Sequence, residues 1–143
     1  REAGIFQYGK GNINSALRYL ERSLNISPRD YYCRFYYARA LDDYGDMTAA
    51  LRNYKDVLRY APNDSEVHFY YGRSLGVSGK TCLGYTHMAF ASLYAGNLDK
   101  AAKMRKLASK AAKTPEDNQN LLEFDNKFKE HSAILKKIRK EKL

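Results

Sequence analysis

Apolar residues recur at intervals of three and four positions over most of the chain. The clearest example is the segment 47–60, whose apolar positions are Met47, Ala50, Leu51, Tyr54, Val57 and Leu58. This spacing places them on one face of an α-helix. The helix is predicted to end by residue 60, because Pro62 cannot continue it.

The segment before it, residues 31–44, has no proline and no internal glycine, and it ends at Gly45. A glycine at this place is typical of the C-terminal end of a helix. Further helices are predicted at 81–94 and 98–113. A last helix is predicted after Thr114, which would cap it, with Pro115 in its first turn. Its apolar stripe comprises Leu121, Phe124, Phe128, Leu135 and Ile138.

The helical pattern repeats with a period of 34 residues. The phrase FYYARAL at 35–41 returns as FYYGRSL at 69–75. The same spacing relates Gly11 to Gly45 and Gly79, Ala16 to Ala50 and Gly84, Leu24 to Leu58, Pro28 to Pro62, and Asp30 to Asp64. A fixed period of this length indicates stacked supersecondary units, each a helix, a tight turn and a second helix.

At these residues the chain resembles the tetratricopeptide repeat family. Residues 31–64 match that repeat without a gap, including the small residues Ala38 and Ala50 inside the two helices. The resemblance implies an all-α fold, a tetratricopeptide-like α-solenoid of antiparallel helix pairs. We expect a solenoid over 1–113, with repeats at 1–30 (incomplete), 31–64 and 65–94 and an irregular last helix at 98–113. Residues 114–143 are expected to form a capping helix and a basic tail.

The repeat becomes irregular after Gly79, because the next glycine turn, Gly96-Asn97, follows after only 17 residues. The helix at 81–94 is therefore expected to serve twice, closing the third pair and opening the last one. The final helix would cover the apolar face that the last pair leaves open.

A narrower and looser resemblance covers residues 72–101. This stretch is similar to the C-terminal repeat tail of some HExxH zinc metalloproteases of the bacterial envelope. The resemblance implies a catalytic domain elsewhere in a longer protein and a periplasmic or envelope location; otherwise a cytoplasmic location is expected. The chain itself contains no HExxH motif and starts at Arg1 rather than Met, which suggests a piece of a longer protein.

The net charge of +9 is unevenly distributed. Residues 1–99 contain 12 Lys and Arg against 10 Asp and Glu, whereas residues 100–143 contain 13 against 6. No apolar run approaches the length that crosses a bilayer. The basic character therefore belongs to the C-terminal third of the chain.

The sequence contains no recognisable catalytic motif. The histidines are His68, His87 and His131, and neither His68 nor His87 has a second His or carboxylate three or four residues later. No nucleophile elbow or phosphate loop is present. Cys33 and Cys82 lack metal-binding spacing and are expected to be buried apolar side chains. We therefore expect no enzyme activity in this chain, no cofactor and no metal.

Protein binding is the predicted function. In the family, the first helices of successive repeats line a concave groove that binds a peptide or a partner domain. Carried onto this chain, the groove positions are Tyr32, Phe35, Arg39, Asp42, Glu66, Phe69 and Arg73. They would suit a peptide with apolar side chains and an acidic group. Packing within the chain is the other explanation for these aromatic residues.

An alternative hypothesis starts from the basic residues. Lys103, Lys106, Lys110 and Lys113 follow one face of the predicted helix 98–113. Such a face suits nucleic acid or another anionic surface, or is simply a solvated helix face. Nucleic acid is disfavoured as a partner because aromatic stacking motifs are missing from this region. The Ala-rich opposite side of this helix argues against membrane insertion.

Overall fold

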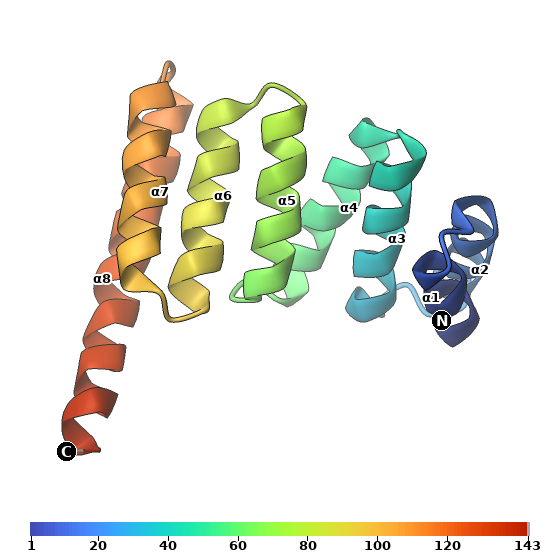
Figure 1. The fold of residues 1–143 in the computed structure, drawn as a ribbon, viewed down its shortest axis with the longest axis horizontal. Helices are drawn as coiled ribbons and strands as arrows, with labels where there is room; N and C mark the ends of the chain where they lie inside the picture. Colours follow the sequence, from blue (N-terminus) through green and yellow to red (C-terminus); the bar gives the residue numbers. More distant parts are fainter. Residues whose placement is uncertain (143) are drawn as a thin grey trace. The chain divides into compact units, whose positions relative to one another are not determined.

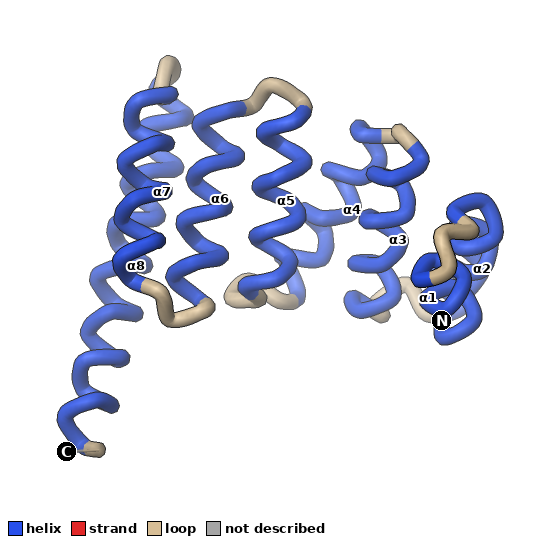
Figure 2. The backbone as a smooth tube through the Cα atoms, viewed as in Figure 1, coloured by secondary structure: helices blue, strands red, loops and turns tan. Residues whose placement is uncertain are grey.

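The structure is a computed structural model that describes residues 1–142, and within them every regular element is an α-helix (Figure 2). The helices are α1 (Glu2–Gly9), α2 (Ile13–Ile26), α3 (Tyr31–Tyr44), α4 (Met47–Tyr60), α5 (Ser65–Val77), α6 (Thr81–Tyr94), α7 (Leu98–Ala111) and α8 (Pro115–Glu141) (Figure 1). None of these helices is both long and apolar enough to cross a membrane.

The predicted ends of the helices at 31–44, 47–60 and 81–94 agree with the structure. Gly45 and Gly79 have φ of 103° and 90°, a left-handed conformation that glycine adopts without a steric penalty. After Gly45 the chain turns back at once, because the N–H of Asp46 donates to the carbonyl of Leu41 over 2.9 Å. The turns between paired helices therefore form as the glycine spacing predicted.

The helix predicted at 98–113 is shorter in the structure and ends at Ala111. Ala112 adopts an extended conformation, and the N–H of Lys113 donates to the Asp117 carboxylate instead of continuing the helix. The start of α8 agrees with the prediction. The Thr114 hydroxyl oxygen accepts a hydrogen bond from the N–H of Asp117, and Pro115 is the first residue of the helix. Thr114 and Asp117 form a reciprocal capping box.

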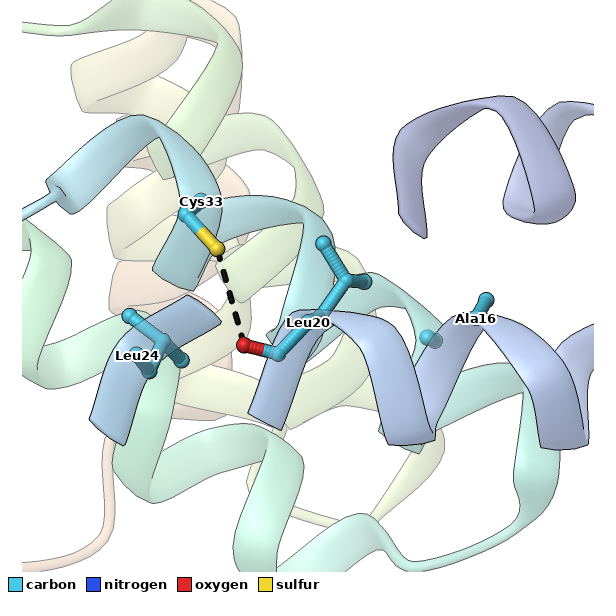
Figure 3. Close-up of a cluster of buried hydrophobic side chains, with 5 residues drawn as sticks. Ala16, Leu20, Leu24 and Cys33 are labelled. Atoms are coloured by element: carbon cyan, nitrogen blue, oxygen red, sulfur yellow. Dashed lines mark hydrogen bonds between the residues drawn. The ribbon is translucent and has the colours of Figure 1, made fainter. Parts of the chain in front are cut away.

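The chain comprises two compact units, Arg1–Pro62 and Asn63–Leu143. In the first unit α2 packs against α1 and α3, and α3 packs against α4. Its core contains Ala16, Leu20, Leu24, Cys33 and Ala40. The Cys33 thiol is fully buried and donates to the carbonyl of Leu20 over 3.7 Å (Figure 3).

In the second unit α6 packs against α5, α7 and α8 (Figure 1). The expected double use of this helix is thus confirmed. Two clusters line it: Ala89, Leu93, Ala101 and Phe124 form one, and Cys82, Ala108 and Leu121 form the other. Both clusters include apolar residues of α8, so this helix covers the last pair as expected. The predicted boundary at residue 113, between repeats and cap, stays a prediction.

Cys33 and Cys82 are buried, as the sequence predicted, and both are free thiols. Burial raises the pKa of both thiols, which keeps them protonated near neutral pH.

Candidate functional site

The candidate site is an exposed face of α5 in the second unit. Asp64 starts this helix by accepting from the N–H of Val67 over 3.1 Å. The Ser65 hydroxyl donates to the carbonyl of Ala91 over 2.7 Å, which ties the beginning of α5 to the end of α6. One side of α5 is buried, and the opposite side presents Glu66, Phe69, Arg73 and Val77 to solvent.

Two cavities lie along this face, between α5 and α6. A cavity of about 470 Å³ lies near the start of α5, lined by Glu66 and Phe69 and, from α7, by Lys100. A second cavity of about 380 Å³ lies near the end of α5, lined by Arg73 and Val77 and, from α6, by Tyr85 and Met88, among others. The helix positions that line both cavities fall on one side of α5 and on one side of α6. The two hollows therefore belong to one groove, and three of the seven predicted groove residues line it.

Three glycines line the second cavity, and two of them bring α5 and α6 into close contact. A Cβ at Gly72 would lie 2.8 Å from the carbonyl oxygen of Gly84, and a Cβ at Gly84 would lie 2.9 Å from that of Gly72. A Cβ at Gly76 would meet no atom within 4 Å. Gly76 adds no side chain to this cavity, and Val77 and Met88 also line it.

Arg73 supplies the positive charge of this groove. Its guanidinium lies 5.0 Å from the ring centre of Tyr70, and Phe69 packs edge-on against the same ring. Stacking restricts the arginine side chain while its N–H groups stay available for a carboxylate. The Phe69 side chain is 38% exposed, so it offers apolar surface next to this charge.

The first unit contains the other four predicted residues. Tyr32 is 45% exposed, whereas Phe35 is only 5% exposed and packs against Tyr36 and Tyr54. Phe35 therefore has little surface left for a ligand. Arg39 is partly buried, and its guanidinium lies 5.1 Å from the ring centre of Tyr8.

Asp42 is partly buried in the same unit. The binding role of all seven predicted residues stays a prediction.

A histidine pair that the sequence analysis treated as separate residues lies beside this face. The Nδ1 atoms of His68 and His87 are 3.0 Å apart, and the two rings stack with Phe90 nearby. Burial, and secondarily the neighbouring His68, lowers the pKa of His87 to about 3. His68 and His87 lie at almost the same sequence distance from the turn at Ser78. Residues at equal distances from the turn of an antiparallel helix pair face each other, so this spacing could have predicted the contact.

Metal chemistry gains no support from this pair. Within residues 1–142, no group of three or more His, Cys, Asp or Glu side chains is arranged to hold a metal ion. The His131 ring lies edge-on to Tyr94 at 5.5 Å, and Tyr94 also contacts His68.

The predicted basic face is only partly helical. Lys103, Lys106 and Lys110 are exposed on α7, but Lys113 lies beyond the end of that helix. The one arginine of α7, Arg105, pairs with Asp125 of α8 over 2.8 Å, so it joins two helices. Lys103, Lys106 and Lys110 therefore remain as candidates for contact with an anionic partner.

Comparison with known proteins gives one family. Residues 7–69 match the model of the tetratricopeptide repeat. No curated protein is significantly similar to the chain. The match includes the 34-residue spacing of the turns and does not extend to the stretch that resembles a metalloprotease tail, so that resemblance stays a prediction.

Solved structures give a similar fold. The MamA RS-1 ArsTM double mutant is 16% identical and has a TM-score of 0.51, covering 99% of this chain and 93% of its own. A further MamA crystal structure is 16% identical with a TM-score of 0.49, covering 95% of this chain and 86% of its own. The fold is thus all-α and tetratricopeptide-like, and residues 7–69 match the tetratricopeptide repeat.

Proposed function

We propose that this chain binds a peptide segment of a protein partner along the α5–α6 groove of the second unit. The observation that carries the proposal is the combination of two adjoining cavities with the exposed side chains of Phe69, Val77 and Arg73. A ligand that fits has apolar side chains for the cavities and an acidic group for Arg73.

Tetratricopeptide repeats support the general role of a protein–protein interaction module. The fold is generally non-catalytic, which is consistent with the expectation that this chain is not an enzyme. Docking onto another domain of the same protein, including a metalloprotease domain, is a special case of the proposal, with an envelope location as its consequence. In that case the bound peptide would be a segment of the same polypeptide.

The proposal is tested by selecting peptides from a random library on the immobilised chain and measuring their affinity. Selected peptides should combine aliphatic or aromatic residues with Asp or Glu. The Arg73→Ala substitution should weaken them by about tenfold or more, because it removes a charged partner next to apolar surface. Lys103→Ala, on the exposed face of α7, is the matched control and should leave affinity unchanged.

Two results would contradict the groove. Equal losses in both variants would indicate general attraction to positive charge rather than binding in the groove. Unchanged affinity in Arg73→Ala and in Phe69→Ala would show that the selected peptides bind elsewhere.

A further inference from the structure

The last helix is much longer than the helices that it covers. α8 has 27 residues and α7 has 14, so at 1.5 Å per residue they are about 40 Å and about 21 Å long. Figure 1 shows the C-terminal part of α8, in red, running past the turn between α6 and α7. Ser132 is the last buried residue of this helix. We call residues 133–142 the α8 tail.

Large aliphatic side chains remain exposed on the α8 tail. Ile134 is 56% exposed and Ile138 is 44% exposed, and Leu135 is partly buried. Positions 134 and 138 are one helical turn apart, and 135 lies on the side between them and the buried stripe. The tail therefore continues an apolar face after the helices that cover it have ended.

The charge around this apolar face has one sign. The tail contains five basic residues and a single acid, Glu141, with the basic positions being Lys136, Lys137, Arg139, Lys140 and Lys142. All five are exposed. A second copy of this chain would bring like charges together, so self-association through the tail is disfavoured. Charge complementarity requires an anionic occupant.

We propose that the α8 tail docks on an anionic phospholipid surface. An interfacial helix needs aliphatic side chains on one side and lysines whose long side chains reach the phosphates from the other. The tail combines both features. Within the second unit α8 packs only against α6 and α7, so no further helix forms a wall that could select the shape of a protein ligand. This site is separate from the α5–α6 groove.

The Ala-rich side of helix 98–113 argues against membrane insertion of that helix, but this argument does not apply to α8. Isoleucine and leucine bury far more apolar surface per residue than alanine. The contact is peripheral, since no helix of the described chain could span a bilayer.

The test uses the absence of tryptophan from the chain. Ile138→Trp places one fluorophore on the apolar side of the tail, and Ala133→Trp places one on its polar side as the matched control. Both variants of the full chain are mixed with vesicles of phosphatidylcholine, with and without phosphatidylglycerol. The expected result is a blue shift of the tryptophan emission of Ile138→Trp only with phosphatidylglycerol present, and no shift of the emission of Ala133→Trp.

Charge reversal completes the experiment. In the Ile138→Trp background, Lys136→Glu with Lys140→Glu should weaken vesicle binding by more than about tenfold. Lys103→Glu with Lys106→Glu, on α7, should weaken it less, and circular dichroism checks that both variants are folded. The proposal is overturned if the emission of Ile138→Trp does not shift, or if the α7 pair matters and the tail pair does not. Vesicle binding without this shift would instead indicate a purely electrostatic contact with the lipid headgroups.

Discussion

At the scale of single residues, the His68–His87 pair makes packing depend on protonation. Two imidazoles that share a hydrogen bond need one donor and one acceptor, so at least one ring must be neutral. The surrounding Tyr71, Phe90 and Tyr94 provide no charge that would compensate a second proton. The lowered pKa of His87 follows from this burial.

Because of this pair, we expect the free energy of unfolding to fall in mild acid. The folded chain keeps His87 neutral down to a pKa of about 3, whereas an unfolded histidine takes up its proton near pH 6.5. The unfolded state therefore binds more protons between these values, and stability falls as pH falls through this window. Urea midpoints at pH 7.5 and pH 5 measure the fall, with pH 5 chosen to lie above most carboxylate pKa values.

The His87→Gln variant isolates the contribution of the ring. It should be less stable at pH 7.5, because His68 loses its partner, but should lose less stability on going to pH 5. An equal loss in wild type and variant would show that His87 does not cause the acid sensitivity.

At the scale of helices, the close packing of α5 against α6 requires glycine at positions 72 and 84. Gly72 and Gly84 bring two backbones so close that a Cβ on either would lie within 3.0 Å of a carbonyl oxygen. Backbone cannot move aside as the end of a flexible side chain can. The contact thus explains why small residues recur at these places in the repeat.

Two alanine substitutions four residues apart should have opposite effects. Gly72→Ala should destabilise the protein by about 1–3 kcal/mol, since overpacking forces the helices apart. Gly76→Ala is on the same helix, meets no atom within 4 Å, and should stabilise by about 0.5–1 kcal/mol through higher helix propensity. Denaturant unfolding measures both, and destabilisation by Gly76→Ala to the same extent would refute the close-contact explanation.

At the scale of the whole molecule, α8 both closes the second unit and extends beyond it. Its first half buries Leu121 and Phe124 against α6 and α7. The Arg105–Asp125 pair and the Thr114 capping box hold the same half in place. The second half contributes exposed charge and exposed aliphatic surface, so one helix combines a structural and a candidate binding role.

The structural role can be measured with a buried and an exposed residue of α8. Phe124 is 1% exposed and contacts Phe90 and Phe128, so Phe124→Ala should cost about 3–5 kcal/mol. Leu122 is 53% exposed, and Leu122→Ala should change stability by less than about 0.5 kcal/mol. Thermal unfolding compares the two variants, and similar small effects would mean that α8 is not needed as a cap.

Much of the fold could be predicted because the same pattern of residues recurs every 34 positions. Glycine, proline and small residues at a constant spacing specify turns and helix contacts by local stereochemistry. The end of α7 could not be predicted to the residue, because the carboxylate of Asp117 competes for the N–H of Lys113. Such competition depends on side-chain geometry rather than on a pattern.

The sequence by itself determined the all-α class, the paired helices, the turn glycines and the cap that starts at Thr114. These properties arise from backbone preferences and apolar periodicity, which act within a few residues. Only the tertiary structure decided that Phe35 is buried while Phe69 is exposed, and that His68 meets His87. Equivalent positions of a repeat differ in this way because exposure and pairing depend on neighbours distant in sequence, and those neighbours do not repeat.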